Sequence, residues 1–296
     1  MDITIVIPVY NRKTYIEKTL ESIPHSYPVI LVDNGSTDGS LELCTELAKK
    51  RTNTRVTTEQ TPGAAAARNK GLSLCTSKWV YFFDSDDIFT GLPATWNEEN
   101  DLVCIPTKQQ LGDKTQVRAY KPVTTPHTHI LNSMLNSVSM IFRTEFLRNI
   151  GGWNTRCLIW DDWELGLRSL LKTSKVQWIT DTVYHIILIH PDSLTGPDLS
   201  SRIDRILTVL GIAFNNIYDL QPQNKQAFAA LFYRCYILCG QMQQEGDAHA
   251  AGRIRTFIYD RFTVNKQSHQ MGQLLEWGAQ KGLRGMWKIA LWVVNR

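Results

Sequence analysis

The chain has 296 residues, of which 43% are hydrophobic and 20% charged, and its formal net charge is +4. This composition is typical of a globular protein with a sizeable core, and the length exceeds that of a usual single domain. The positive charge is too small to indicate a nucleic-acid partner, and we expect none. It is compatible with anionic small molecules or with an anionic membrane surface.

Cysteines and apolar runs indicate the compartment. The six cysteines are scattered, without a CxxC pair or a spacing typical of metal sites, which predicts a reducing compartment. The N-terminal residues lack a signal-peptide pattern, and no run reaches the ~18–20 apolar residues that span a membrane. We therefore expect a cytoplasmic protein, with the apolar stretch 286–294 as a candidate for peripheral contact with the inner face of the membrane.

Residues 1–90 alternate between strand-like and helix-like patterns. The predicted strands are 3–7, 29–32, 55–59 and 79–83, and the predicted helices are 13–23, 37–50 and 64–74. Such alternation is typical of a parallel sheet with helices on both faces, an α/β architecture. Ligands of these sheets bind at the carboxyl ends of the strands.

The pattern changes twice further along the chain. Residues 101–105 form the next predicted strand, and a polar stretch without a predicted element follows to about residue 135. The later predicted strands are 137–142, 176–179 and 183–189, with helices at 144–150 and 161–172. Beyond residue 200 only helices are expected, at 202–220, 224–243, 247–262 and 270–293. We therefore predict an α/β domain over 1–200, with halves 1–100 and 101–200, and a helical extension over 201–296.

Three carboxylates follow the predicted strand 79–83 within four residues: Asp84, Asp86 and Asp87. Closely spaced carboxylate oxygens suit Mg²⁺ or Mn²⁺, ions that also bind phosphate oxygens. A solvated turn or a helix cap explains the same residues without a metal. Two other polar segments, Pro8-Val9-Tyr10-Asn11 and Asp33-Asn34-Gly35, also follow predicted strands and should lie at the same edge of the sheet.

Four segments in this order resemble the inverting family 2 glycosyltransferases of the GT-A fold. They are ITIVIPVYN at 3–11, VDNGSTD at 32–38, GAAAARNKG at 63–71 and YFFDSDD at 81–87. The segments GGWN at 151–154 and WDDWELGLR at 160–168 resemble the acceptor side of that family. The resemblance covers about residues 1–195 and implies a GT-A fold followed by helices that carry no family pattern.

The resemblance implies roles for the donor side. Asp86 is expected to bind Mn²⁺ or Mg²⁺ on the donor diphosphate, and Asp84 to contact the ion or the ribose. Ser85 lies between them in the donor loop, and Asp87 either supports the site or caps a helix. His190 matches a segment in which some members place a histidine on the metal or the diphosphate, although a lone histidine is more often structural.

Base recognition is expected at the first two strand ends. The resemblance places Asp33 on the base and ribose, where the family has two consecutive acids and this chain has Asp33-Asn34. An asparagine can both accept and donate, so the nucleotide stays open, with a UDP-sugar as the expected donor. The residues expected to wall the base pocket are Pro8, Val9 and Tyr10.

The sequence allows two roles for Arg68. Its place on an Ala-rich helix near the same edge suits a contact to a phosphate or the base. A surface arginine on a helix is the alternative.

The acceptor side is expected at the acid pair Asp161-Asp162. Inverting transfer needs a base that deprotonates the acceptor hydroxyl, and the resemblance assigns that role to Asp162. Asp161 would orient the helix or contact the acceptor. A pair of helix-capping acids explains both residues without catalysis. Trp153, on a glycine-rich loop, is the candidate for stacking on an acceptor sugar.

The expected function is a metal-dependent inverting glycosyltransferase of cell-surface polysaccharide synthesis. Its partners would be a nucleoside-diphosphate sugar and a glycan or lipid-linked acceptor, and the C-terminal helices are a candidate homodimer interface. A sugar-phosphate nucleotidyltransferase is one alternative, which the absence of a Gly-rich basic loop after the first strand disfavours. A non-catalytic glycan-binding or assembly subunit on the same fold is the other.

Overall fold

The computed structural model describes residues 2–111, 114–117, 122–180, 182, 184–188 and 198–296. They group into two compact units, and each is described by itself. The first unit comprises Met1–Pro122, Leu135–Leu165 and Thr173–Ser193, and the second comprises Val123–Met134, Gly166–Lys172 and Leu194–Arg296. The last segment of the second unit begins near the predicted division at residue 200, but two earlier segments also join that unit.

A seven-stranded sheet forms the first unit, in the order β10-β6-β9-β4-β1-β2-β3. Its strands are β1 (Ile3–Val9), β2 (Val29–Asp33), β3 (Thr54–Thr58), β4 (Trp79–Phe82), β6 (Leu102–Cys104), β9 (Met140–Arg143) and β10 (Val176–Trp178). β9 runs antiparallel to β4 and β6, whereas the remaining pairs are parallel. The predicted α/β architecture with a mostly parallel sheet is confirmed.

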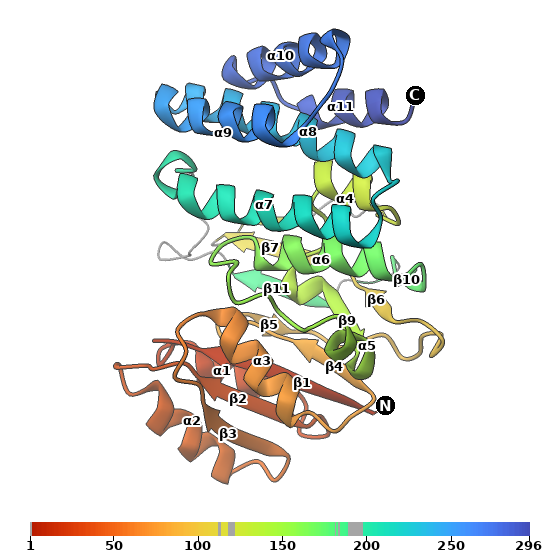
Figure 1. Ribbon diagram of the computed structural model, residues 1–296. Helices are drawn as coiled ribbons and strands as arrows, with labels where there is room; N and C mark the ends of the chain where they lie inside the picture. The colour runs from red at the N-terminus through yellow and green to blue at the C-terminus, as the bar shows by residue number, and fades with distance from the viewer. Residues whose placement is uncertain (1, 112–113, 118–121, 181, 183, 189–197) are drawn as a thin grey trace. The chain divides into compact units, whose positions relative to one another are not determined.

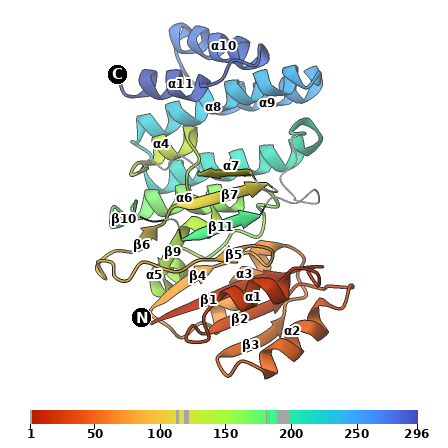
Figure 2. The same ribbon diagram turned by 180° about the vertical axis from the view of Figure 1, so that it is seen from behind.

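Helices cover both faces of this sheet (Figures 1 and 2). α1 (Ile16–Ser22) and α2 (Ser40–Lys49) connect strands that step outward from β1 to β3, and α3 (Ala64–Leu74) returns the chain to β4. Right-handed crossovers therefore place α3 on the face opposite α1 and α2. Successive β1 side chains pack on opposite faces: Ile5 belongs to the core cluster with α1, while Val6 lies against Gly71 of α3.

The stretch around residues 101–135, expected to be irregular after its first strand, contains regular elements, so that expectation is wrong. A second, four-stranded sheet has the order β5-β11-β7-β8, formed by β5 (Ile88–Phe89), β7 (Thr107–Leu111), β8 (Lys114–Val117) and β11 (His185–Leu188). α4 (Pro126–Leu131) begins at Thr125, whose hydroxyl accepts from the Thr128 N–H. β7 and β8 are polar and lack the apolar alternation that identifies a half-buried strand.

Two short helices adjoin the strand predicted at 137–142. Its first residues form the 3₁₀ helix η1 (Ser137–Ser139), so β9 begins only at Met140. α5 (Thr144–Asn149) then follows β9 directly, close to the predicted helix at 144–150.

The second unit is helical around a central helix, α8 (Lys225–Gln244). α7 (Ile203–Leu220) lies on one side of α8, and α10 (Lys266–Gln280) and α11 (Met286–Val294) lie on the other (Figures 1 and 2). α9 (Ala248–Arg261) packs along α8, and the 3₁₀ helix η2 (Ser200–Arg202) precedes α7. The first three helices predicted beyond residue 200 are confirmed.

The single helix predicted at 270–293 is wrong. The structure has α10 (Lys266–Gln280) and α11 (Met286–Val294) instead. Gly282 and Gly285 between them have φ values of +70° and +88°. A right-handed helix cannot continue through that left-handed conformation, which glycine adopts at little cost.

Gly240 allows α8 and α10 to approach closely, and its replacement by alanine is expected to destabilise the chain. A Cβ at this position would lie 2.2 Å from the Glu276 carbonyl oxygen and 2.7 Å from Ala279 Cβ, so the helices would have to separate. We expect Gly240→Ala to lower the free energy of unfolding by about 1–3 kcal/mol. Gly252→Ala on α9 is the control, because its Cβ meets nothing within 4 Å and should stabilise by about 0.5–1 kcal/mol. Equal effects of the two substitutions in denaturant unfolding would contradict the close packing.

All six cysteines are buried and free, as expected for a chain without a disulfide framework. Among the described residues, no helix combines the length and the apolar character needed to cross a bilayer.

Candidate active site

The three polar segments meet at one edge of the seven-stranded sheet, as predicted. In the strand register Val9 pairs with Asp33, and Val6 pairs with Phe82. β1 is parallel to both β2 and β4, so the carboxyl ends of these three strands point the same way. Asp84 and the residues that follow it therefore lie at the same edge as Asp33.

Asp33 is 3% exposed, and only one of its carboxylate oxygens is engaged. Oδ2 accepts from the backbone N–H groups of Gly35 (3.1 Å) and Ser36 (3.2 Å). Oδ1 is buried and makes no hydrogen bond within the described part of the chain. A buried carboxylate oxygen in this state would gain from a donor group supplied by a ligand.

Asn34 holds the loop after β3 in place. Its Nδ2 donates to the carbonyl oxygens of Glu59 (2.9 Å) and Thr61 (2.8 Å), and its Oδ1 accepts from the Gly63 N–H (2.7 Å). Both amide hydrogens are thus engaged in protein contacts. The expectation that the Asn34 amide donates to a base is wrong, because its hydrogen bonds hold the loop between Glu59 and Gly63.

Only some of the residues expected to wall the base pocket, at the end of β1, are exposed. Val9 is fully buried and Pro8 is partly buried, whereas Tyr10 is 59% exposed. Ser85 is buried, and its carbonyl oxygen accepts from the Thr19 hydroxyl (3.1 Å). Tyr10 is therefore the most exposed of these four residues, and a donor contact of the Ser85 side chain stays a prediction.

Asp84 and Asp86 each form an ion pair with an arginine. Asp84 Oδ1 lies 3.1 Å from Arg68 Nη2, and Asp86 Oδ2 lies 3.2 Å from Arg12 Nε. Asp84 also accepts from the Ser137 hydroxyl at 3.5 Å. Arg12 was not predicted as a site residue. A cation directly after the strand-end segment Pro8–Asn11, on the same edge as three acids, is the signal that could have identified it.

Asp87 is buried and does not cap a helix, because β5 begins at the next residue. Its Oδ1 accepts from the Leu188 N–H (2.9 Å), and its Oδ2 lies 2.6 Å from His185 Nε2. The Tyr81 hydroxyl donates to the Val138 carbonyl oxygen (2.8 Å) and lies 2.8 Å from His185 Nδ1. The cap reading of Asp87 is wrong, and its role is to tie β11 to the donor loop.

The acid pair opens α6 (Asp161–Lys172). The Arg68 guanidinium donates to Asp161 Oδ2 at 2.8 Å, and Asp161 Oδ1 accepts from the Asp162 N–H at 3.1 Å. Asp162 Oδ1 accepts from the Trp163 N–H at 2.7 Å. Arg68 is 7% exposed and so is no surface arginine; it joins Asp161 to Asp84 through one guanidinium group.

The pKa values of the pair are shifted in a direction that suits a base. Burial, followed by the neighbouring charge of Asp161, raises the pKa of Asp162 to about 6. Burial also raises the pKa of Asp161, against the attraction of Arg68. For Arg68, burial acts to lower the pKa, but the carboxylates of Asp161 and Asp84 outweigh it and raise the pKa. A pKa of about 6 allows Asp162 to gain and lose a proton near neutral pH.

Trp153 is 1% exposed, so the expectation that its ring stacks on an acceptor sugar is wrong. The ring packs edge-on against Phe82 with centroids 5.1 Å apart, and the Arg68 guanidinium carbon lies 4.4 Å above it. Asn69 of α3 holds the loop by two hydrogen bonds of 2.8 Å to the Trp153 backbone. The Trp153 ring thus packs against the Arg68 guanidinium and does not face the acceptor.

Of the two remaining tryptophans of the acceptor-side segment, Trp163 belongs to the core and Trp160 is partly buried. Trp163 is 2% exposed, and its ring lies edge-on to that of Trp160, with centroids 6.3 Å apart.

The donor set for a divalent cation consists of carboxylates. Asp84 and Asp86 supply oxygens that suit Mg²⁺ or Mn²⁺, and both already face a cationic group, so their chemistry fits such an ion. The described residues contain no group of three or more His, Cys, Asp or Glu side chains placed to hold a metal. A bound phosphate or water could supply further ligands. His190 lies outside the described residues, so its predicted contact to the metal stays a prediction.

Residues 4–137 match the family model described as glycosyl transferase family 2. The putative glycosyltransferase EpsH of Bacillus subtilis is 34% identical over 110 residues, which cover 34% of this chain and 32% of that protein. The minor teichoic acid biosynthesis protein GgaB of the same organism is 27% identical over 208 residues, covering 62% of this chain and 23% of that protein. These matches thus span less than a third of either relative's length.

Solved structures share the fold at low sequence identity. The crystal structure of S. aureus TarS 1–349 has a TM-score of 0.68 and 17% identity, covering 100% of this chain and 91% of that chain. The same protein with UDP-GlcNAc has a TM-score of 0.63 and 16% identity, covering 100% of this chain and 92% of that chain.

A third structure is the mannosyltransferase PcManGT of Pyrobaculum calidifontis, in complex with GDP-Man and Mn²⁺. It has a TM-score of 0.55 and 17% identity, covering 99% of this chain and 84% of that chain. The expected GT-A fold with C-terminal helices is confirmed, and the likeness to glycosyl transferase family 2 extends over residues 4–137.

Proposed function

We propose that the chain is a metal-dependent, inverting glycosyltransferase that moves a sugar from a nucleoside-diphosphate donor to a hydroxyl of a glycan or lipid-linked glycan. The observation that carries the proposal is the connection Asp84–Arg68–Asp161 beside Asp162. It joins the strand-end carboxylate Asp84 to the start of α6, where the next residue, Asp162, has a pKa raised to about 6. One edge of the sheet thus supplies groups for both the leaving diphosphate and the incoming hydroxyl.

The donor nucleoside would bind at the ends of β1 and β2. Asp33 Oδ1 is a buried acceptor that a ribose hydroxyl or a base N–H would satisfy after a local shift of the loop. The exposed ring of Tyr10 would pack on the base. Asn34 would act indirectly, by holding the loop that ends at Gly63.

Mn²⁺ or Mg²⁺ would be held by Asp86 and Asp84 together with the donor phosphates. When bound, such an ion stabilises the negative charge of a departing diphosphate as a Lewis acid. Arg12 would then exchange its contact with Asp86 for one with a phosphate oxygen. The Arg68 guanidinium keeps the nearby carboxylates compensated throughout.

Asp162 would act as the base. Its Oδ1 is engaged by the Trp163 N–H, which orients the carboxylate and leaves Oδ2 to accept the proton of the acceptor hydroxyl. The hydroxyl oxygen forms its bond to the anomeric carbon from the side opposite the leaving group, while the bond from that carbon to the diphosphate oxygen breaks. The diphosphate retains that electron pair, and configuration at the anomeric carbon inverts. Asp161 would position Arg68 and the start of α6.

Relatives support a role in polysaccharide synthesis and a UDP-sugar as the donor. GgaB is named for minor teichoic acid biosynthesis, and TarS is solved with UDP-GlcNAc. PcManGT is solved with GDP-Man, so GDP-sugars belong in the same test.

A thermal-shift titration tests the donor site. We expect UDP or GDP with Mn²⁺ to stabilise the chain by about 2.7 kcal/mol at a hundredfold excess over Kd. Asp86→Ala should abolish the Mn²⁺-dependent part of this shift, whereas Asp219→Ala, at an exposed position of α7, should leave it unchanged.

Two outcomes would contradict the proposal. Release of pyrophosphate from a nucleoside triphosphate and a sugar phosphate would identify a nucleotidyltransferase. Binding of glycans without stabilisation by any nucleotide would identify a binding subunit.

A further inference from the structure

The outer faces of α10 and α11 expose large apolar side chains. Trp277 and Trp292 are each 53% exposed, Leu274 is also 53% exposed, and Ile289 is 41% exposed. Leu283, on the turn between the two helices, is 49% exposed. Tryptophan is usually well buried, and soluble proteins seldom expose several such residues within one pair of helices.

Both helices are two-sided, and their other sides are packed. α10 buries Gly272, Leu275 and Ala279, while Leu274 and Trp277 point outward. α11 buries Ala290 and Val294. On a helical projection the exposed residues of α11 centre on Trp292, with Ile289 beside it and two basic residues, Lys288 and Arg296, on the same face.

The charge of this surface has one sign. Residues 277–296 contain four basic residues and no aspartate or glutamate: Lys281, Arg284, Lys288 and Arg296. The preceding acid, Glu276, is buried and forms an ion pair with Arg255. The Arg296 guanidinium carbon lies 3.5 Å from the ring centroid of Trp292, so a cation accompanies an exposed aromatic side chain.

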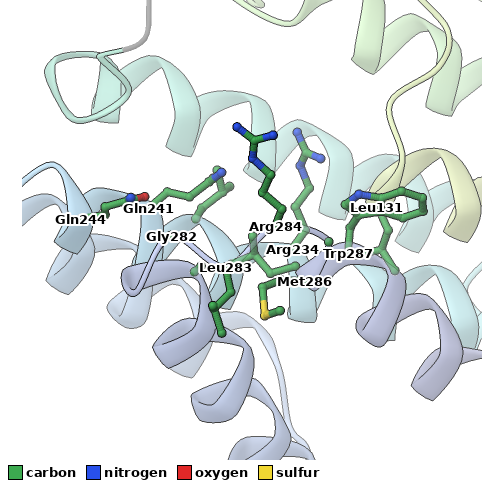
Figure 3. A pocket seen from close by; sticks show the side chains of 13 residues that line it. Leu131, Arg234, Gln241, Gln244, Gly282, Leu283, Arg284, Met286 and Trp287 are labelled. Carbon is green, nitrogen blue, oxygen red and sulfur yellow. The ribbon is translucent and has the colours of Figure 1, made fainter. Parts of the chain in front are cut away.

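A pocket of about 370 Å³ beside the α10–α11 turn is lined by two arginines, Arg234 and Arg284. Figure 3 shows the guanidinium groups of Arg234 and Arg284 extending in the same direction from its wall. Arg234 Nη1 donates to the Ile130 carbonyl oxygen at 2.8 Å. Burial lowers the pKa of Arg234 to about 10, which leaves it positively charged at neutral pH. Two neighbouring guanidinium groups suit the phosphate of a lipid headgroup.

We propose that α10, the turn and α11 dock the chain on the surface of a bilayer that contains anionic phospholipids, with Trp277 and Trp292 at the headgroup level. Tryptophan favours this interface, and basic side chains add attraction to anionic headgroups. A second copy of the chain is a poorer occupant, since a two-fold interface places the same patch on itself and would bring these like charges together. The inference concerns binding alone and does not depend on the reaction.

Vesicle flotation with the full chain tests this surface. We expect binding to vesicles of phosphatidylglycerol and phosphatidylcholine in equal parts, little binding to phosphatidylcholine alone, and weaker binding as salt rises. The variant Lys281→Glu/Arg284→Glu should weaken binding by more than about tenfold. Trp277→Gln/Trp292→Gln should weaken binding at high salt as well as at low salt, because the apolar contribution is not screened.

Matched controls use exposed residues elsewhere. Tyr218→Gln on α7, 62% exposed, controls for the loss of an aromatic side chain, and Lys49→Glu/Lys50→Glu for the change of charge. Both should bind like the unaltered chain, and circular dichroism melting should show that all variants fold.

Two results would overturn the proposal. One is binding that does not differ between the two vesicle types or among the variants, including no binding at all. The other is a dimer in sedimentation velocity that the tryptophan variant converts to monomer, which would make this surface an interface between copies.

Discussion

Replacement of Asp162 by asparagine is expected to lower kcat by at least about 10²–10⁴-fold, the usual contribution of a positioned general base. The amide can still accept the Trp163 N–H bond through its oxygen, so the start of α6 should keep its geometry. It cannot take a proton from the acceptor hydroxyl. Turnover of the donor with and without acceptor measures the effect. Transfer within a factor of a few of the unaltered rate would exclude Asp162 as the base.

The same residue should set the pH dependence of the reaction. Because burial raises its pKa to about 6, Asp162 is charged above that pH and protonated below it. A base must be unprotonated, so kcat/KM should fall as the pH decreases through about 6. The residual activity of Asp162→Asn should lack this acidic limb. An unchanged limb in the variant would assign the titration to another group.

Asp162→Asn should raise the free energy of unfolding although it lowers activity. The folded-state pKa of Asp162 lies above the ordinary value of 3.8, so ionisation of this group opposes folding. Asp162→Asn removes that cost and should stabilise the chain above pH 6 by up to about 3 kcal/mol, at 1.36 kcal/mol per pKa unit. The gain should decrease between pH 6 and 4, where Asp162 becomes protonated in the folded state. Denaturant unfolding across this range, with Asp219→Asn as the exposed control, measures it.

Replacement of Arg68 by methionine is expected to destabilise the chain by about 1–3 kcal/mol, because it leaves two partly buried carboxylates without their shared donor. Methionine retains much of the length and contact over Trp153 but leaves Asp84 and Asp161 without their shared cation. Unfolding in urea measures the loss. Arg55→Met on β3, at an exposed position, is the matched control and should change stability by less than about 0.5 kcal/mol.

Two further results separate charge from packing at Arg68. Lower pH should reduce the destabilisation, because the uncompensated carboxylates become protonated. Asp161→Asn added to Arg68→Met should recover part of the stability for the same reason. A loss that is insensitive to both changes would show that Arg68 contributes mainly by packing on Trp153.

The strand-end segments could be predicted because their positions depend on local patterns. Short apolar runs separated by amphipathic helices identify parallel strands, and the carboxyl ends of parallel strands share an edge. Asp33 and Asp84 therefore follow from the sequence without knowledge of distant contacts. β9 runs against its neighbours, and nothing in its apolar sequence indicates that direction.

Side-chain roles that depend on distant partners could not be predicted. Arg68 bonds to Asp161, which lies 93 positions away. The local sequence suggested a phosphate or base contact or a surface arginine, and neither describes this buried bridge. Trp153 was assigned to the acceptor from its glycine-rich loop, but Asn69 and Arg68 bury it. A lone histidine carries little local information, so the sequence did not identify His185 as the buried partner of Asp87. The glycines of the α10–α11 turn were visible in the sequence, and their positive φ values explain the error there.

The central claim is that Asp86 contributes to donor binding and Asp162 only to the chemical step. Equilibrium titration of a donor nucleotide in the presence of Mn²⁺ tests this claim most directly. Asp162→Asn should bind UDP or GDP with the affinity of the unaltered chain while transfer is lost. Asp86→Asn should lose the Mn²⁺-dependent part of the affinity. Equal affinity in all three proteins, or loss of nucleotide binding in Asp162→Asn alone, would contradict this division of roles.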